Sequence, residues 1–353
     1  MYFEPLKTRN NTESMHLRFR VFSVFRGFAI TSIGVLLGTA ALAAFAAKCP
    51  PVAPFAKGEQ VVFLGDSITR QGWYEGYVQQ FLDVHHSGLG VKVVNAGISG
   101  DTSAGALERF DWDLKPMKPD HVFVMFGMND VDVKLYTGQP DDDAPKDARA
   151  AKIAAFERNM RTLADRIIAE GWKLVLMTPT PYDEYSKTNK GQIWKGANEK
   201  GLAACAEVVR RIAAEKGVPL VELYRPLTKA WKAASDGDGY TVDRVHPSEA
   251  GYRLVAAEIL KAAGIAEPSF ATNGPAYEAM RETVERTSKP RFIPQMRMEI
   301  SRRGGDPENR ESFEKTVAAW RRELESDDDK KSYVGWFSEI WDYYRKEKFN
   351  EKQ

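Results

Sequence analysis

Ser67 is the residue best placed for chemistry, because it follows a run of side chains typical of a buried strand. The run Val61–Leu64 is β-branched and aromatic, and it ends at Gly65-Asp66-Ser67. Open α/β sheets place reacting groups at the carboxyl ends of such strands. The Ser67 hydroxyl could therefore act as a nucleophile. The alternative interpretation is that Asp66 or Ser67 only caps the next helix.

A base and an acid that could serve this nucleophile stand near residue 245. Asp243 precedes His246 by three residues, so its carboxylate can reach one imidazole nitrogen within a single turn of chain. That contact would fix the tautomer and favour the imidazolium formed when a serine loses its proton. Pro247 disfavours a helical conformation at His246, which predicts a loop just before a helix. A helix N-terminus with a capping acid is the alternative.

Hydrogen-bond donors for an oxyanion follow two further apolar runs. Gly100 lies in Asn95–Asp101, where the missing Cβ lets the backbone approach a ligand and its N–H donate. Asn129 lies in Phe126–Asp130 and offers a side-chain amide. With the backbone N–H of Ser67 these make three donors, and one such donor is typically worth about 3 kcal/mol. The combined set predicts attack on an ester carbonyl.

The elements that must position these residues alternate between strand and helix patterns. Apolar side chains recur at helical spacing in Ile153–Glu170, and a last helix is expected over Ser248–Ala263. This alternation predicts an α/β fold in which helices cover both faces of a parallel sheet. The expected strands are Gln60–Leu64, Val91–Asn95, His121–Phe126, Lys173–Met177 and Pro219–Leu223.

Taken together, the blocks resemble the SGNH hydrolases, also called the GDSL esterase and lipase superfamily, which are named for Ser, Gly, Asn and His in this order. The resembling segments are Gly65-Asp66-Ser67, with Ile68 where the shorter name has Leu, Gly100 within Ile-Ser-Gly-Asp-Thr, Gly127-Met128-Asn129-Asp130 and Asp243-Arg244-Val245-His246. A Gly-x-Ser-x-Gly elbow, typical of the unrelated α/β-hydrolases, is absent around Ser67.

The resemblance covers residues 58–264 and implies a three-layer α/β/α flavodoxin-like fold with a five-stranded parallel sheet. It implies Ser67, His246 and Asp243 as catalytic residues, with an oxyanion hole from Ser67, Gly100 and Asn129. It implies no metal and no cofactor. The substrate would be a small-molecule or glycan ester.

The favoured substrate class is an O-acetylated carbohydrate, because the amino-acid sequences of the segments around Ser67 and Asn129 resemble those of exported bacterial family members that act on such sugars. A lipid esterase or lysophospholipase is the alternative enzyme, and a non-catalytic glycan-binding module is the alternative of another class. Trp73, Tyr74 and Tyr77 could flank the site as a platform or pack inside the protein. Polar residues expected around the site disfavour a long acyl chain; they are Arg70, Gln71, Asp101, Thr102, Asp130 and Asp183.

Length and charge set the remaining organisation of the 353-residue chain. The 50 basic and 49 acidic residues nearly cancel, so the sequence carries no electrostatic footprint for nucleic acid. We expect a signal peptide or anchor at residues 1–47, a linker at 48–57, the hydrolase domain at 58–264 and a charged helical extension at 265–353. The sequence leaves the oligomeric state open.

The first residues predict export to the periplasm or the cell exterior. Arginines precede the uncharged stretch Gly27–Ala47, which ends near Ala44-Phe45-Ala46, a small-x-small pattern. An uncleaved anchor is the alternative, because the stretch is long enough to span a bilayer. It would be the chain's only contact with a membrane. Lys48 disfavours lipidation of Cys49.

Three further features have interpretations from the sequence alone. Cys205 is expected as a buried apolar residue, and its pairing with Cys49 is left open. Asp141–Asp143 is interpreted as a solvated acidic loop rather than a calcium site. In the extension, aromatic and apolar residues at three- and four-residue steps predict a helix that packs on the main domain or on a partner chain; they are Tyr333, Trp336, Phe337, Ile340, Trp341 and Tyr344.

Overall fold

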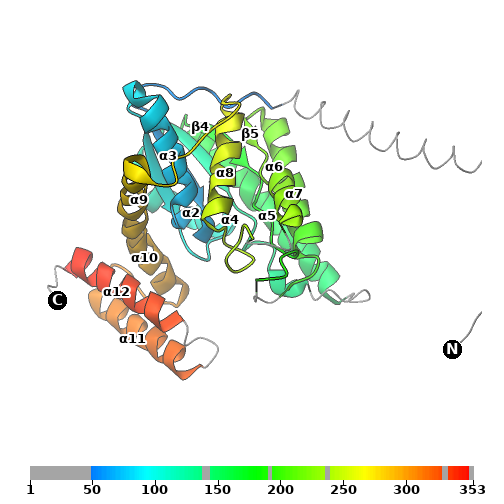
Figure 1. The fold of residues 1–353 in the computed structure, drawn as a ribbon. Helices are drawn as coiled ribbons and strands as arrows, with labels where there is room; N and C mark the ends of the chain where they lie inside the picture. The colour runs from blue at the N-terminus through cyan, green and yellow to red at the C-terminus, as the bar shows by residue number, and fades with distance from the viewer. Residues whose placement is uncertain (1–48, 137–143, 190–192, 235–238, 328–332, 350–353) are drawn as a thin grey trace, which may run out of the picture. The chain divides into compact units, whose positions relative to one another are not determined.

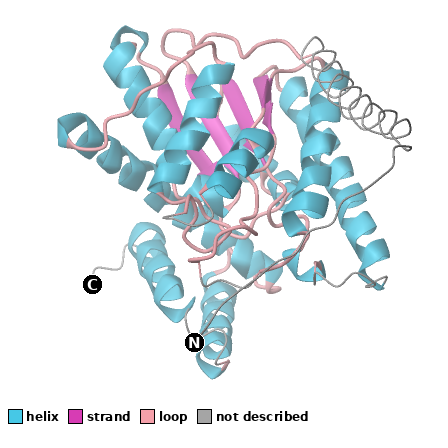
Figure 2. Cartoon of the chain, turned by 45° about the vertical axis from the view of Figure 1, so that its right-hand side comes forward, coloured by secondary structure: helices cyan, strands magenta, loops and turns pink. Residues whose placement is uncertain are grey.

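The computed structural model describes residues 49–136, 144–189, 193–234, 239–327 and 333–349. Its centre is a sheet of five parallel strands in the order β2-β1-β3-β4-β5 (Figures 1 and 2). This is the flavodoxin-like order, so the expected α/β fold is confirmed. The strands are β1 (Gln60–Gly65), β2 (Lys92–Gly97), β3 (His121–Met125), β4 (Lys173–Met177) and β5 (Leu220–Val221).

The strand sequences are apolar because both faces of the sheet are covered. Every residue of β3 is buried, and β1 is buried from Val61 onward. The last strand, β5, is shorter than the expected Pro219–Leu223. It ends early because the Thr178 hydroxyl accepts hydrogen bonds from the backbone N–H groups of Leu223 and Tyr224, in place of a backbone carbonyl.

Helices cover the sheet on both sides. Helices α3 and α8 contact each other on one face, while α5 contacts both α4 and α6 on the other (Figure 2). The helices are α2 (Ser67–Arg70), α3 (Trp73–His85), α4 (Ser103–Glu108), α5 (Ala144–Ala169), α6 (Ala203–Lys216), α7 (Tyr224–Ala233), α8 (Glu249–Ala262), α9 (Gly274–Ser288), α10 (Phe292–Arg302), α11 (Arg310–Ser326) and α12 (Val334–Phe349).

The two expected helices occur with different starting points. Helix α8 agrees with the expectation to within a residue at each end, and Ser248 is its N-cap. Helix α5 begins at Ala144, nine residues before the expected Ile153. The aspartates at 141–143 lie outside the described residues.

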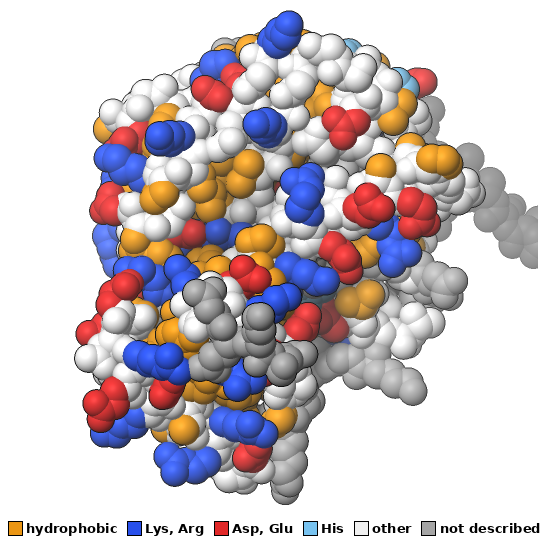
Figure 3. Space-filling model, turned by 90° about the vertical axis from the view of Figure 1, so that its left-hand side faces the viewer, with side chains coloured by type: hydrophobic (Ala, Val, Ile, Leu, Met, Phe, Trp, Pro, Cys, Tyr) orange, Lys and Arg blue, Asp and Glu red, His pale blue; other side chains and the backbone are white. Residues whose placement is uncertain are grey.

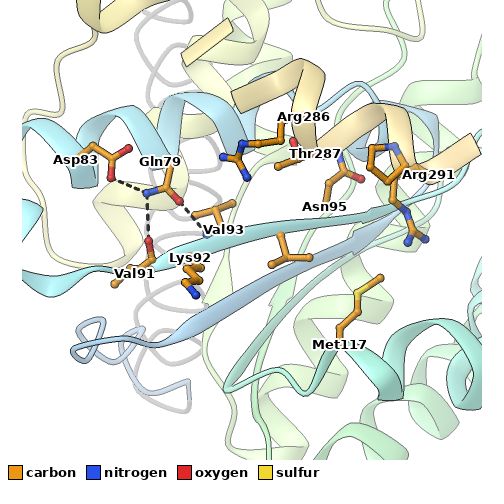
Figure 4. Close-up of a pocket in the computed structure, with 12 residues that line it drawn as sticks. Gln79, Asp83, Val91, Lys92, Val93, Asn95, Met117, Arg286, Thr287 and Arg291 are labelled. Atoms are coloured by element: carbon orange, nitrogen blue, oxygen red, sulfur yellow. Dashed lines mark hydrogen bonds between the residues drawn. The ribbon is translucent and has the colours of Figure 1, made fainter. Parts of the chain in front are cut away.

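The extension begins as part of the main domain. Helix α9 packs on α3, and its Met280 and Val284 belong to the main hydrophobic core. Together with the short helix η6 (Lys289–Arg291) it lies along β2, the edge strand of the sheet. A pocket of about 560 Å³ remains there, where Gln79 accepts from the Val93 N–H and donates to the Val91 carbonyl (Figure 4). An exposed strand edge can pair with other chains. Here the edge of β2 is covered by α9, η6 and the Gln79 side chain.

A second hydrophobic core joins α10, α11 and α12 (Figure 1). Phe313 of α11 stacks on Tyr344 of α12 with ring centroids 4.5 Å apart, and Trp320 meets Phe337 edge to face. The aromatic stripe of the sequence therefore forms a helix from Val334 onward, and the expectation that this helix packs on the main domain was wrong, while its packing on a partner chain stays a prediction. The helix packs on two other helices of the extension, because these carry matching apolar faces.

Cysteines and surface charges complete the description. Cys49 and Cys205 are both free thiols, and burial raises the pKa of Cys205 well above its usual value. On the face drawn in Figure 3, basic and acidic side chains are interspersed. Within the described residues, no helix is long and apolar enough to cross a membrane.

Candidate active site

Three of the predicted site residues form a continuous hydrogen-bonded chain. The Nε2 of His246 lies 2.8 Å from the Ser67 hydroxyl oxygen, and its Nδ1 lies 2.6 Å from an Asp243 carboxylate oxygen. The imidazole thus connects an acid on one side with a hydroxyl 179 residues away in sequence on the other. Both distances are within the range that proton transfer requires.

Ser67 is positioned by the tight junction between β1 and α2. Asp66 is the N-cap of α2, and its carboxylate accepts from the Ile68 N–H at 2.9 Å. Gly65 permits the approach of this turn, since a Cβ there would lie 2.1 Å from the Thr69 hydroxyl oxygen. The helix-cap interpretation of the sequence therefore holds for Asp66, while the neighbouring Ser67 side chain is left to contact His246.

A closed loop presents Asp243 and His246. Thr241 and Pro247 form an antiparallel bridge, and the Val242 N–H donates to the His246 carbonyl at 2.9 Å. Asp243 accepts from the backbone N–H of His246 at 2.7 Å as well as from its ring. Partial burial opposes ionisation of Asp243, but its hydrogen bonds with His246 outweigh this and lower the pKa of the carboxyl. The anion is thus the favoured form opposite the imidazole.

The oxyanion donors expected from Gly100 and Asn129 lie beside each other. One N–H of the Asn129 amide donates to the Asp101 carbonyl at 2.8 Å, which links Asn129 to the residue after Gly100 and leaves its second N–H available. Gly100 has a φ of 71°, in the left-handed region that favours glycine. Within the described residues, no hydrogen bond occupies the backbone N–H of Gly100 or Ser67.

Two buried acids are sequence neighbours of the candidate site residues: Asp66 precedes Ser67, and Asp130 follows Asn129. Burial raises the pKa of Asp66 to about 7, although the bond from Ile68 lowers it. Burial likewise raises the pKa of Asp130 to about 6 against the hydrogen bonds from Ser103. Ser67 therefore follows directly after a buried carboxyl whose pKa is raised toward neutrality, a feature that the sequence gives no means of predicting.

The polar residues expected to surround the site do not all face it. Asp101 is fully buried and bonds to Arg109 and Arg302, and Asp130 bonds to Ser103. Asp183 accepts from Thr241 at 2.6 Å. The expectation that these three carboxylates line the acyl pocket was wrong, because buried carboxylates are stable only with such partners.

Of the aromatic residues expected near Ser67, two are packing residues. Tyr74 and Tyr77 have no exposed surface, and the Tyr74 hydroxyl is hydrogen-bonded to Thr69. Tyr74 also meets Phe63 edge to face. Trp73 is half-buried against the main core. The platform interpretation therefore fails for the two tyrosines.

Arg109 is the main residue near the site that the sequence reasoning missed. It has no exposed surface, binds Asp101 and Asp113, and donates to the carbonyls of Gly65 and Ala96 at the ends of β1 and β2. The four-residue spacing of Arg109 and Asp113 was a signal for such a pair. Its burial behind the site depends on tertiary packing and has no local signature.

In the described part of the chain, no group of three or more His, Cys, Asp or Glu residues could hold a metal ion.

The candidate site is open to solvent: the Asp243 side chain is 52% exposed and that of His246 23%. Ser67 is itself partly exposed, so the candidate site does not lie at the bottom of a closed tunnel.

Comparisons with known proteins agree with this geometry. A family model, the GDSL-like lipase/acylhydrolase family, matches residues 63–254. The chain is 29% identical over 224 residues to an acetylxylan esterase from Geobacillus stearothermophilus, which covers 59% of this chain and 94% of that protein. It is 30% identical over 197 residues to the uncharacterized lipoprotein YqeF of Bacillus subtilis, covering 51% and 74% of the two chains.

A solved structure is similar to a comparable share of the chain. The chain is 28% identical to BT4096, described as a gut microbial diltiazem-metabolizing enzyme, with a TM-score of 0.55. The match covers 61% of this chain and 48% of the other, so this chain spans about half the length of that protein.

The parallel sheet with Ser, Gly, Asn and His blocks at its carboxyl edge defines the SGNH class of hydrolases. The chain belongs to the GDSL-like lipase/acylhydrolase family, whose model matches more than half of it. It is a carboxylic ester hydrolase.

Proposed function

We propose that the chain is a serine esterase in which Ser67 is the nucleophile, His246 the general base and Asp243 the residue that orients the imidazole. The observation that carries this proposal is the hydrogen-bonded chain from Asp243 through His246 to Ser67, at 2.6 and 2.8 Å. It combines a nucleophile, a base and an orienting acid, which is the arrangement that activates a serine hydroxyl.

Hydrolysis would take two steps. His246 accepts the proton of the Ser67 hydroxyl as Oγ bonds to the acyl carbon, and the tetrahedral intermediate then expels the alcohol, which takes the proton from His246. Water attacks the acyl-serine by the same route, releasing the carboxylic acid and restoring Ser67. Asp243 stays ionised throughout and stabilises the imidazolium, in keeping with its lowered pKa.

The negative oxygen of each intermediate would be bound by three donors, namely the backbone N–H groups of Ser67 and Gly100 and the second N–H of Asn129. The bond from Asn129 to the Asp101 carbonyl supports this, because it holds the amide before substrate arrives. Preorganised donors are effective since no reorientation is needed as charge develops.

We assign the substrate class as short acyl esters, chiefly O-acetyl groups, on carbohydrate. The acetylxylan esterase relative supports this assignment, as nearly its whole length aligns with this chain. The exposure of Asp243 and His246 gives a second argument. A polysaccharide can reach an open site, whereas a long acyl chain requires a buried apolar groove.

We further propose that the hydrolase domain spans residues 58–264 and that the protein is exported. The lipoprotein relative supports export, and so does the apolar stretch that precedes the linker at 48–57. Met280 and Val284 of α9 belong to the main core, so the first helix of the extension packs directly on this domain.

The experiment compares wild type with Ser67→Ala, His246→Ala and the double variant, following acetate release from acetylated xylan. Each single variant should lose nearly all activity, and the double variant should be little worse, because the two residues act in one proton-transfer unit. Circular dichroism would establish that the variants are folded.

Three outcomes contradict the proposal in different ways. Multiplicative losses in the double variant would argue against the Ser67–His246 pairing. Activity only on long-chain esters would favour a lipid esterase. Wild-type protein that binds acetylated xylan but is not labelled by a fluorophosphonate would favour a non-catalytic glycan-binding module.

A further inference from the structure

Helix α10 of the extension holds the backbone of the loop that carries Gly100. Gln295 has no exposed surface, and its side-chain oxygen accepts from the Ser99 N–H at 2.6 Å. Its side-chain nitrogen donates to the Ser99 carbonyl at 3.1 Å. One buried amide thus binds both polar backbone groups of the residue that precedes Gly100, across 196 positions of sequence.

The bond to the Ser99 carbonyl has a direct effect on the oxyanion donor. The Ser99 carbonyl and the Gly100 N–H belong to the same peptide unit, and in a planar trans peptide they point in opposite directions. When Gln295 binds the carbonyl, the plane of the unit is fixed and the Gly100 N–H faces away from α10. Gly100 has a φ of 71°, and a glycine can also adopt other backbone conformations at little steric cost, so this bond restricts rotation of the peptide unit.

Two arginines secure the same loop from the extension. Arg291 of η6 donates to the Gly97 carbonyl at 3.2 Å and binds both carboxylate oxygens of Asp113. Arg302, at the end of α10, lies 3.2 Å from an Asp101 carboxylate oxygen. The loop from Gly97 to Asp101 is therefore bound to the extension before, at and after Ser99.

We propose that Gln295 is a positioning residue for ester hydrolysis: it acts through Ser99 to aim the Gly100 N–H at the oxyanion. The inference rests on the proposed serine mechanism and its oxyanion hole. It gives the extension, which lies beyond the matched residues 63–254, a part in the reaction.

The test uses the full-length protein and p-nitrophenyl acetate. Gln295→Met preserves side-chain length but removes both hydrogen bonds, so kcat should fall by about 10-fold or more, short of the 10² to 10³ lost when a donor is deleted outright. KM should change little, because the donor acts on the developing oxyanion. Ser301→Ala, an exposed position on α10, is the matched control and should retain wild-type kcat.

A second readout separates positioning from folding. Phenylboronic acid forms a tetrahedral anionic adduct with an active serine, so its affinity for Gln295→Met should fall by about the same factor as kcat. If that variant melts at a lower temperature, Gln295→Glu replaces it. Burial at this position raises the pKa of the glutamate, so kcat is followed upward in pH: the protonated carboxyl can still donate to the Ser99 carbonyl, whereas the ionised form can only accept from the Ser99 N–H, and kcat should fall as the carboxyl ionises.

The outcomes distinguish this inference from the function on which it rests. Wild-type kcat and boronate affinity in both Gln295 variants would overturn the positioning role. A rise in KM at unchanged kcat would also overturn it, since Gln295 would then serve ground-state binding. Wild-type protein that does not hydrolyse p-nitrophenyl acetate would overturn the serine-esterase proposal itself.

Discussion

Asp66 and Ser67 are adjacent in the chain, but the side chain of Asp66 is buried and that of Ser67 is partly exposed. The Ser67 side chain reaches His246, whereas Asp66 is 2% exposed and its pKa is raised to about 7 by burial. The unperturbed pKa of an aspartate is about 3.9. Between these values the folded state binds more protons than the unfolded state, so the free energy of unfolding contributed by Asp66 decreases as pH rises through about 7.

Asp66→Asn should therefore become relatively more stable as pH increases. The asparagine oxygen can still accept from the Ile68 N–H, but it cannot ionise. The difference in unfolding free energy between variant and wild type should rise from pH 4 to pH 8 by up to about 4 kcal/mol, at 1.36 kcal/mol for each pKa unit. Denaturant titrations at several pH values measure it, and a pH-independent difference would contradict the burial argument.

Kinetics can separate the proposed oxyanion role of Asn129 from a role in substrate binding. One of its amide hydrogens is bound to the Asp101 carbonyl, so only the second could bind an oxyanion. Asn129→Ala should lower kcat by about 10² to 10³ with a small change in KM. Steady-state kinetics on p-nitrophenyl acetate provide the measurement. Wild-type kcat combined with a raised KM would assign Asn129 to ground-state recognition instead.

At the scale of elements, the position of Ser67 depends on how α2 packs against the end of β2. A Cβ added at Gly97 would lie 2.1 Å from the backbone nitrogen of Arg70, so α2 would have to move. The hydroxyl of Ser67, at the start of that helix, would move with it. Gly97 is also the residue whose carbonyl Arg291 binds.

Gly97→Ala should consequently reduce both stability and activity. Overpacking typically costs about 1–3 kcal/mol, and the clash here is with backbone rather than with a flexible side chain. Gly88→Ala is the matched control, because nothing lies within 4 Å of a Cβ at Gly88. Thermal melting and kcat are measured for both variants. Equal behaviour of the two would show that α2 can adapt without displacing Ser67.

The sheet and its covering helices were predictable because their patterns are local. Apolar runs such as that of β1 report burial on both faces, and the blocks at their ends report what the strands carry. The partners of Ser99 and Asp101 were not predictable. Gln295 and Arg302 lie about 200 residues further along the chain, in a helix whose sequence indicates only that one face is apolar.

Because tertiary partners have no local sequence signal, the expected positions of three carboxylates near the site were also wrong. Asp101, Asp130 and Asp183 lie next to the sequence blocks, but proximity in sequence does not tell whether a carboxylate faces the pocket or a buried arginine or hydroxyl. Each was paired inside the protein, as buried carboxylates must be. By contrast, Asp243 and His246 are three residues apart, so the chain itself brings them together.

Across the whole molecule, the described residues form two hydrophobic cores, and a cluster of ion pairs links the extension to the main domain. The main core includes α9, and the second core joins α10 to α12. In this cluster, Asp101 and Asp113 bind Arg109 of the main domain, and they also bind Arg302 and Arg291 of the extension, respectively. This cluster places the extension directly behind the loop that bears Gly100. The extension is thus attached to the loop that carries Gly100, the proposed oxyanion donor.

The proposed assignment as a short-chain serine esterase is tested by kcat/KM for p-nitrophenyl esters from acetyl to octanoyl, with Ser67→Ala as the blank. An apolar groove would favour each added methylene by about 0.8 kcal/mol, and kcat/KM would rise steeply with chain length. The open site around His246 and Asp243 predicts the reverse, with acetyl preferred and no turnover by Ser67→Ala. A rise with chain length, or full activity without the Ser67 hydroxyl, would contradict the account.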